Sequence, residues 1–335
     1  MKFSKNFVRA NEQLCDFEHF VPAPYFRKRF ILNSKPRKAE ITICGLGFYE
    51  LYINGTKITK GFLAPYISNP DDLLYYDSYN VSEYLKTGEN VVGVILGNGM
   101  QNCFGGAVWD FDKAQFRSAP EFAFWMSVEY HDGSKYEIDA SDFVWNSSPV
   151  IMNDLRAGEW YDARHEIKGW NLPGLDDSDW CEVISAEEPR GEMRLTDIEP
   201  IITTKELLPV NIHKSKISIF PELGENIPDI PIPEDEDVTE GYLYDFGINT
   251  AGVCRLKIKN SFPGQKVILQ FGEILGELDE DGKTIRNENS GLDLRGFHFL
   301  PHRFNNRDVY ICKGADEEAW IPSLKVMRNL DAPMT

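Results

Sequence analysis

Short stretches in which hydrophobic and polar residues alternate, each closed by a turn signal, make up most of the chain. Tyr49, Leu51 and Ile53 fall on one side of an extended segment, and Asn54-Gly55 follows, a pair that tolerates the positive φ angles of a two-residue hairpin. Residues 122–130 and 135–138 repeat the pattern on either side of an Asp-Gly pair. Alternation with a period of two predicts strands that bury one face, so these segments are expected to form β-hairpins.

Other segments extend this prediction, and helix signals are few. Residues 91–96 are a nearly continuous apolar run, which is typical of a buried strand. Residues 254–258 and 267–271 alternate on either side of a Pro-Gly turn and read as an outgoing and a returning strand. The best helix signal covers residues 81–86, with Asn80 as N-cap. The sequence therefore predicts an all-β protein of two consecutive β-sandwich or jelly-roll domains.

A change of composition divides the chain in two. Residues 170–188 are rich in Asp, Gly and Trp, as in a closing loop, and the sequence just after them interrupts regular structure. We therefore expect a jelly-roll-like domain in residues 1–190 and a second β-sandwich domain in residues 191–335. Residues 221–240 are rich in proline and acid, which predicts a mobile insertion in the second domain.

Composition narrows the classes of partner. The chain of 335 residues has a formal net charge of −18, which repels phosphate backbones and anionic lipids, so neither nucleic acid nor a membrane is expected as a partner. The six cysteines are scattered without a C-x-x-C pair, which fits reduced thiols better than a disulfide framework or a zinc site. The first residues contain no apolar signal segment, so we expect a cytoplasmic protein.

Motifs of known catalytic chemistry are missing from the sequence. It contains neither a G-x-S-x-G nucleophile elbow nor a P-loop, and its six histidines are isolated. Acidic residues are so numerous that no pair stands out as the acid and base of a hydrolytic site. No catalytic residue can therefore be assigned from the sequence.

One long loop has the composition of a sugar-binding site. Residues 97–112 follow the buried strand and contain glycines, amides, two aspartates and a tryptophan. Amides and acids bind hydroxyl groups, an indole stacks on the apolar face of a pyranose, and acid and amide oxygens also suit calcium. The candidates for sugar or calcium binding are Asp71, Asp72, Asn98, Trp109, Asp110 and Asp112. The alternative is a structural loop in which Trp109 plugs the end of the sandwich.

Several segments, in order along the chain, resemble the bacterial α-L-rhamnosidases of glycoside hydrolase family 78. The resemblance rests on Phe48–Gly55 with Leu63-Ala64-Pro65, Gly88–Val94, Gly158–Arg164 with Gly169-Trp170 and Asp177–Trp180, Tyr244–Asn249, Phe271–Leu275, Asp308–Gly314 and Glu318–Ser323. It extends from about residue 25 to residue 323. It implies that the first domain is similar to a carbohydrate-binding module and that a second β-sandwich follows.

The resemblance also implies what the chain does. In the family a catalytic (α/α)6 barrel follows these domains and hydrolyses terminal α-L-rhamnosyl residues with inversion, using a general acid and a general base. Residues 324–335 depart from the family pattern, so we expect a C-terminally truncated, non-catalytic fragment with an accessory role toward rhamnosides or other carbohydrates. Two alternatives remain open: a free-standing sugar-binding protein, and a truncated product with no function of its own.

Overall fold

The computed structural model describes residues 6–16, 19–103, 111–154, 158–216, 240–248, 250–272, 307–325 and 328–330, together with the pairs 274–275, 277–278, 284–285 and 292–293. Its regular elements there are β-strands and single 3₁₀ turns, which confirms the predicted all-β class. None of the helical turns in this part has the length or hydropathy of a membrane-crossing helix. The predicted mobile insertion at 221–240 falls almost wholly outside the described residues.

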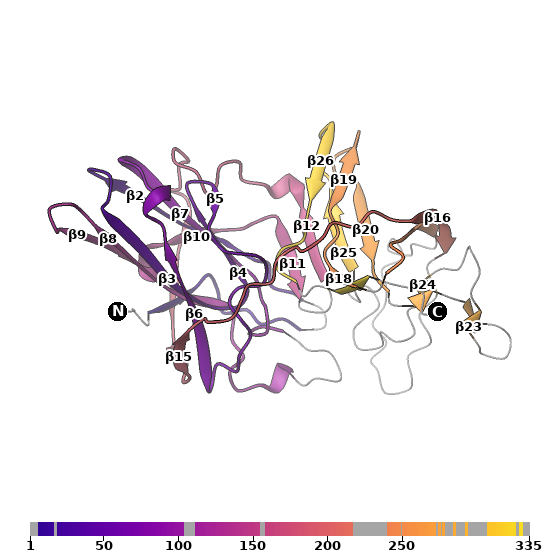
Figure 1. The fold of residues 1–335 in the computed structure, drawn as a ribbon, viewed down its shortest axis with the longest axis horizontal. Helices are drawn as coiled ribbons and strands as arrows, with labels where there is room; N and C mark the ends of the chain where they lie inside the picture. The colour runs from indigo at the N-terminus through magenta and orange to yellow at the C-terminus, as the bar shows by residue number, and fades with distance from the viewer. Residues whose placement is uncertain are drawn as a thin grey trace.

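Two antiparallel sheets face each other in the first half of the chain (Figure 1). The seven-stranded sheet has the order β14-β1-β8-β3-β6-β15, with β9 paired to β8, and contains β1 (Phe7–Arg9), β3 (Lys38–Leu46), β6 (Leu73–Asn80), β8 (Glu121–Glu129), β9 (Lys135–Asp139), β14 (Ile184–Ala186) and β15 (Glu192–Leu195). The six-stranded sheet has the order β13-β10-β2-β7-β4-β5 and contains β2 (Tyr25–Leu32), β4 (Tyr49–Ile53), β5 (Thr56–Lys57), β7 (Gly88–Leu96), β10 (Val144–Asn146) and β13 (Cys181–Glu182). β15 joins its sheet in parallel to β6, and the other pairs are antiparallel.

The core of this sandwich is built from the inward side chains that the alternating pattern predicted. Leu51 and Ile53 are fully buried in a cluster that the two sheets share. Phe122 and Phe124 enter it from β8 and both pack edge-on against Phe143. Each buried aromatic or aliphatic side chain removes apolar surface from water, which makes this cluster the main stabilising feature of the domain.

The predicted hairpins are confirmed and the predicted helix is not. Asn54 and Gly55 have φ angles of 49° and 84° and connect β4 to β5, and β8 pairs with β9 around the second predicted turn. In place of a helix over 81–86, only the 3₁₀ turn η1 (Ser82–Tyr84) forms. The Asn90 side chain accepts a hydrogen bond from the Lys86 N–H at 3.0 Å and donates one to the Lys86 carbonyl at 2.7 Å, which ends the turn and directs the chain into β7.

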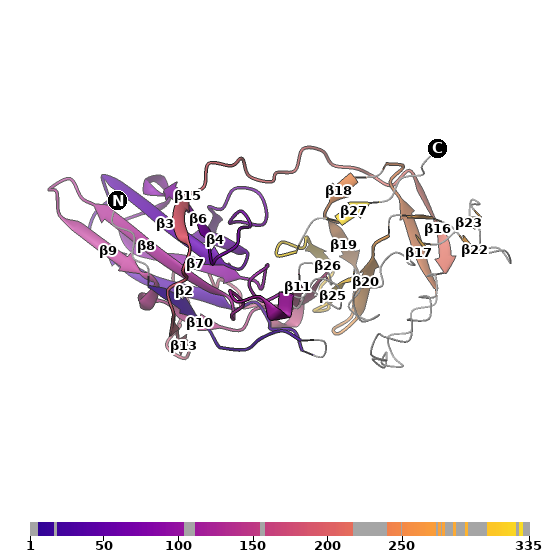
Figure 2. The same cartoon turned by 90° about the horizontal axis from the view of Figure 1, so that it is seen from below.

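A second group of strands follows the first sandwich (Figure 2). Its four-stranded sheet has the order β11-β12-β25-β20 and contains β11 (Val150–Asp154), β12 (Gly158–Asp162), β20 (Lys266–Gln270) and β25 (Arg307–Ile311). Two-stranded pairs surround it: β16 (Asn211–Lys216) with β17 (Glu240–Asp245), β18 (Thr250–Gly252) with β27 (Arg328–Leu330), β19 (Leu256–Lys259) with β26 (Glu317–Trp320), β21 (Ile274–Leu275) with β24 (Leu292–Asp293), and β22 (Glu277–Leu278) with β23 (Thr284–Ile285). The predicted outgoing and returning strands exist as β19 and β20, but each pairs with a different partner and not with the other.

Strand pairing crosses the expected boundary at residues 190 and 191 in both directions. β12 precedes the boundary but pairs in parallel with β25 of the second group. β15 follows the boundary but pairs with β6 of the first sandwich. Because β12 and β15 each pair with a strand on the other side of this boundary, the sheets do not separate at residue 190. The division into residues 1–190 and 191–335 therefore stays a prediction that rests on composition.

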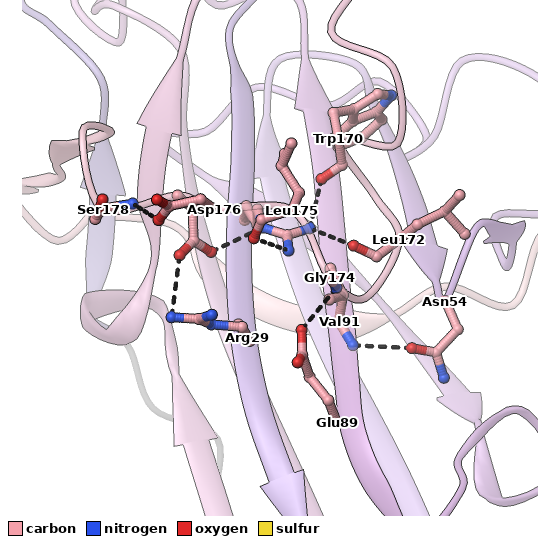
Figure 3. A network of polar contacts seen from close by, with 12 residues as sticks. Arg29, Asn54, Glu89, Val91, Trp170, Leu172, Gly174, Leu175, Asp176 and Ser178 are labelled. Atoms are coloured by element: carbon pink, nitrogen blue, oxygen red, sulfur yellow. Dashed lines mark hydrogen bonds and ion pairs between the residues drawn. The ribbon is translucent and has the colours of Figure 1, made fainter.

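The segment before β13 is held against the six-stranded sheet by one buried arginine. The Arg27 side chain is fully buried on β2. Its guanidinium donates to the Asp177 carboxylate at 2.8 Å and to the carbonyl oxygens of Trp170, Leu172 and Leu175 at 2.7, 3.0 and 3.3 Å. Figure 3 shows these carbonyls turned toward one point from a curved segment. Arginine suits this position because its planar head offers five donors in a fixed arrangement.

Aromatic packing holds the same segment in place. The Trp170 ring stacks on Tyr25 with a centroid distance of 3.9 Å and an interplanar angle of 9°, and it meets Tyr52 edge-on at 5.4 Å. A Cβ atom on Gly93 of β7 would lie 2.7 Å from the indole, so this strand position must lack a side chain. Trp170 of the Gly-Trp motif and Asp177 of the Asp-x-x-Trp motif thus both attach residues 170–177 to the six-stranded sheet, and we call this segment the clasp.

Replacing Arg27 should separate this clasp from the sheet. Arg27→Ala leaves three carbonyls and a largely buried carboxylate without their donor, and we expect a loss of about 3–5 kcal/mol in the free energy of unfolding. Arg29→Ala is the matched control, because Arg29 contacts the same Asp177 at 3.5 Å but is 47% exposed, and we expect it to cost less than about 1 kcal/mol. Urea unfolding followed by tryptophan fluorescence measures both, and equal losses would contradict the clasp.

Candidate functional site

The loop that follows β7 is fixed inside the protein at its beginning. Asn98 is only 1% exposed. Its side-chain NH₂ group donates to the carbonyl oxygens of Val21 and Asn153 at 2.7 and 2.8 Å, and its side-chain oxygen accepts from the Asn102 amide at 3.0 Å. Both ends of this carboxamide are therefore engaged by protein groups, and Asn98 anchors the loop from within.

Asn153 and Gly97 connect this loop to the second group of strands. The Asn153 side-chain oxygen accepts the Asn98 N–H at 2.6 Å. A Cβ atom on Gly97 would lie 2.7 Å from that oxygen and 3.1 Å from the Leu324 Cβ atom. The first sandwich thus ends in a polar cluster that lies directly against residues close to the end of β26.

The turn that contains Asp71 and Asp72 is organised by its own side chains. The Asn69 side chain accepts the Asp71 N–H at 3.1 Å and donates to the Asp72 carboxylate at 2.8 Å. The carbonyl oxygens of Pro70 and Asp72 accept the N–H groups of residues 191 and 192 at 2.9 and 3.0 Å. The turn therefore leads β15 into its pairing with β6.

The six candidate residues are only partly described. Asp112 lies in the 3₁₀ turn η2 (Phe111–Lys113), whereas Trp109 and Asp110 fall outside the described residues. The contacts of Asn98 and those of the Asp71–Asp72 turn go to different elements, so no shared site is assembled from them in the described part. No group of three or more His, Cys, Asp or Glu side chains among the described residues is arranged to hold a metal ion. Sugar or calcium binding by these residues stays a prediction.

A buried ionic cluster lies where β12 and β25 run side by side. Glu159 on β12 accepts the N–H groups of Ser323 and Leu324 at 3.1 and 2.8 Å through one carboxylate oxygen. Asp308 on β25 accepts the Glu159 N–H at 3.0 Å and forms an ion pair with the Lys325 ammonium. All three ionisable side chains are at least 98% buried, so this interdomain junction holds two carboxyl groups and one ammonium away from water.

Two further contacts complete the interdomain junction. The Lys325 ammonium lies 4.3 Å from the centroid of the Phe271 ring, which favours the cation. Gly158 has a φ angle of 129°, and a Cβ atom there would lie 1.9 Å from the Arg307 carbonyl oxygen. Only glycine allows the backbones of β12 and β25 to approach this closely.

Two carboxyl groups have pKa values in the range of a general acid. Burial, with a smaller contribution from the Asp308 carboxylate, raises the pKa of Glu159 to about 8, although the N–H groups of Leu324 and Ser323 and the Lys325 ammonium act to lower it. Burial also raises the pKa of Glu121 to about 7, although Arg9, at 4.0 Å, opposes the shift. Both side chains are at least 95% buried, and Glu159 is bonded to backbone N–H groups. These groups are placed to hold structure together and do not face an open surface where a glycoside could reach them.

The pKa of Glu318 is shifted downward, and hydrogen bonds within the protein cause this shift. Burial alone would raise the pKa of this carboxyl group, but hydrogen bonds from Ser261, Tyr310 and the N–H groups of residues 313–315 outweigh it and lower the pKa to about 2. The carboxylate ties the turn between β25 and β26 to the end of β19. It supports the sheet edge next to the interdomain junction.

Comparison with known families identifies both halves of the chain. The family model described as the α-L-rhamnosidase N-terminal domain matches residues 34–205, and the one described as the bacterial α-L-rhamnosidase concanavalin-like domain matches residues 237–327. The chain belongs to the bacterial α-L-rhamnosidase family. This confirms the resemblance inferred from the sequence, and the interdomain junction joins two modules that are both typical of this family.

The relatives are much longer than this chain. It is 31% identical over 307 residues to an α-L-rhamnosidase of Formosa agariphila, and this match covers 90% of the chain but 28% of that protein. A match to an α-L-rhamnosidase of Streptomyces avermitilis is 28% identical and covers 87% of the chain and 24% of that protein. The chain thus spans about a quarter of the length of these curated relatives.

Solved structures agree with the fold. The α-L-rhamnosidase from Dictyoglumus thermophilum superposes with a TM-score of 0.76 at 29% identity, over 97% of this chain and 33% of that one. The enzyme from Aspergillus terreus gives a TM-score of 0.75 at 22% identity over the same shares, which supports the fold alone.

The interdomain junction was not among the sites predicted from the sequence. The segment Gly158–Arg164 was noted only for its family resemblance, although an isolated acid between a glycine and two aromatic residues is an unusual strand pattern. That pattern is the feature of the sequence by which Glu159 could have been singled out. Asp308 lies 149 residues further along the chain and Lys325 lies further still, and no local pattern connects either of them to β12.

The raised pKa of Glu159 predicts how stability changes with pH. The folded protein holds a proton up to about pH 8 that the unfolded chain releases near its ordinary value of 4.5, so the free energy of unfolding should fall between these pH values. Glu159→Gln keeps an oxygen for the two N–H groups but cannot ionise. We expect it to flatten the decline by up to about 1.4 kcal/mol per pH unit.

Urea unfolding at pH 5, 6.5 and 8 measures this slope. Glu317→Gln is the matched control because its side chain is 73% exposed, and it should follow the unmodified protein. An identical slope for Glu159→Gln and the unmodified protein would show that the junction carboxyl does not change its protonation in this range.

Proposed function

We propose that this chain is a non-catalytic N-terminal part of an α-L-rhamnosidase with an accessory role in carbohydrate recognition. The observation that carries the proposal is the succession of two α-L-rhamnosidase modules, over residues 34–205 and 237–327, in a chain about a quarter as long as its relatives. In longer family members, the hydrolysis of rhamnosides would then belong to the part of the chain that follows these modules.

The geometry of the carboxyl groups supports a non-catalytic role. A glycosidase needs two carboxyl groups at a defined separation on either side of a bound sugar. Among the described residues, the carboxyl groups with pKa values near neutrality, Glu121 and Glu159, are buried in separate places and Glu159 is bonded to backbone. Within the part of the chain that the structure describes, these two groups are therefore not available as an acid–base pair for a substrate.

A carbohydrate partner follows from the same relatives. They are named as α-L-rhamnosidases, and the Streptomyces avermitilis enzyme was solved in complex with L-rhamnose. The loop of residues 97–112 is anchored at Asn98, whose carboxamide donates to the Val21 and Asn153 carbonyls, so the start of the loop is already ordered before any ligand binds. We assign sugar contact to this loop, with Trp109, Asp110 and Asp112 as its candidate residues and calcium as a candidate ligand.

Calorimetric titration with L-rhamnose, with and without calcium chloride, tests this role. We expect binding in about the millimolar range, because a shallow sugar site buries little surface, and we expect Trp109→Ala to abolish it. The same preparation should not hydrolyse an α-L-rhamnoside. Phe262→Ala is the matched control, since Phe262 is a ring that is 64% exposed in the second group of strands, and it should leave binding unchanged.

The outcomes separate the alternatives. Binding that Trp109→Ala removes would place the site on the loop. Binding that survives both substitutions would move it elsewhere, and hydrolysis by the purified chain would refute the non-catalytic assignment. Absence of heat with both ligands would leave a structural module without a sugar site.

A further inference from the structure

The turn between β4 and β5 contains a chemically reactive pair of residues. Asn54-Gly55 is one of two Asn-Gly pairs in the chain, and the other is Asn98-Gly99. In such a pair the backbone nitrogen of the glycine can attack the side-chain carbon of the asparagine, because glycine has no Cβ atom to hinder the approach. Ammonia leaves, and water then opens the cyclic imide to aspartate or isoaspartate. Both pairs are therefore chemically capable of deamidation.

The fold requires glycine at position 55. Gly55 has a φ angle of 84°, which few other residues adopt without strain. A Cβ atom there would lie 2.5 Å from the Leu172 side chain, so the clasp lies against this turn. The clasp is also tied to the neighbouring strand β7, where the Glu89 carboxylate accepts the Gly174 N–H at 2.9 Å. The turn thus keeps the residue that favours deamidation, and the clasp holds it from one side.

Three hydrogen bonds on the Asn54 side chain oppose the attack. Its oxygen accepts from the Val91 N–H at 2.9 Å, as Figure 3 shows. Its NH₂ group donates to the Tyr84 carbonyl oxygen and to the Asn90 side-chain oxygen, both at 2.9 Å. A carboxamide that is held at both ends cannot turn its carbon toward the Gly55 nitrogen without breaking these bonds. Asn90 is fully buried, so its oxygen is a fixed acceptor.

The second Asn-Gly pair is held in the same manner by other residues. The Asn98 carboxamide is bound by the carbonyl oxygens of Val21 and Asn153 and by the Asn102 amide. None of these three residues binds the Asn54 carboxamide, so a local change at one pair leaves the other in place. Asn98 is 1% exposed, whereas Asn54 is only half-buried. Asn54 is therefore the pair that a local opening of the fold exposes first.

We propose that Asn54 is a deamidation site that the Asn90 contact and the clasp together keep unreactive in the folded chain. In the reaction the Gly55 nitrogen forms a bond to the Asn54 side-chain carbon, and the bond from that carbon to Nδ2 breaks. The proton of the Gly55 N–H leaves with the ammonia, and one water molecule then hydrolyses the imide. Isoaspartate lengthens the backbone of the turn, and aspartate places a carboxylate where an NH₂ group donated to the Tyr84 carbonyl oxygen. Either product weakens the β4–β5 hairpin, so conversion records an opening irreversibly.

Conversion at Asn54 can be followed in the intact chain during incubation in mildly alkaline buffer. Peptide mass detects the exchange of the amide for an acid, and an isoaspartyl methyltransferase assay detects isoaspartate independently. We expect conversion to be at least about tenfold slower in the folded chain than in the same chain unfolded in urea. Three hydrogen bonds of ordinary strength together correspond to an effect of at least about this size.

Two substitutions separate the contributions. Asn90→Ala removes one partner of the carboxamide, and we expect it to raise the rate at Asn54 about threefold or more in the folded chain. Asn98 is the internal reference, since its own partners are unchanged. Leu172→Ala removes the contact of the clasp with the turn and should raise the rate about twofold or more. Leu14→Ala is the matched control, because Leu14 and Leu172 are 43% and 44% exposed, and it should change nothing.

Each outcome supports the proposal or overturns it. Faster conversion at Asn54 with an unchanged rate at Asn98 supports it. Equal rates at Asn54 in the folded and the unfolded chain would overturn it, and so would an unchanged rate in either folded variant. A rise by the same factor at Asn54 and Asn98 would assign the effect to global unfolding and overturn the local protection. If Asn90→Ala does not fold, Leu172→Ala decides, because it truncates a side chain that is nearly half exposed.

Discussion

β12 and β25 lie side by side in parallel although Glu159 and Asp308 are 149 residues apart in the sequence, and most of the architecture follows from that pairing. A parallel pair between distant strands requires a long connection, and here the connection contains β13 to β24. Closing so long a loop costs chain entropy, which the junction must offset locally. The buried carboxyl groups, the Lys325 ammonium and the close backbone contact at Gly158 do so at one place.

Buried charge serves two different purposes in this chain. At Arg27 one guanidinium satisfies four acceptors of a single segment, so the charge is fully hydrogen-bonded and fixes local geometry. At the interdomain junction two carboxyl groups and one ammonium are buried together, and burial, with a smaller contribution from Asp308, raises the pKa of Glu159. The first arrangement fixes the position of one segment, whereas the second couples the contact between the two modules to the protonation of Glu159.

The sequence predicted the local features well, because they depend on neighbouring residues. Alternation gave β4, β8 and β9, and Asn54-Gly55 gave a turn, since side-chain direction and positive φ are set within a few residues. The predicted helix over 81–86 was wrong, because the side chain of Asn90, only four residues after Lys86, binds both backbone groups of Lys86 and ends the turn. Long-range pairing was not predictable: nothing near β19 or β20 specifies that they pair with β26 and β25. The same holds for Glu159, whose meaning depends on residues 308 and 323–325.

A perturbed pKa is commonly taken as a mark of an active site, and this chain shows why geometry has to decide. Glu159 has the pKa of a general acid, yet its oxygen accepts two backbone N–H groups and its surroundings are protein on every side. Asn98, chosen for its sugar-binding chemistry, is likewise occupied by Val21, Asn102 and Asn153. In both cases the side chain is used within the fold: Glu159 connects β12 to residues 323 and 324, and Asn98 anchors the start of the loop that follows β7.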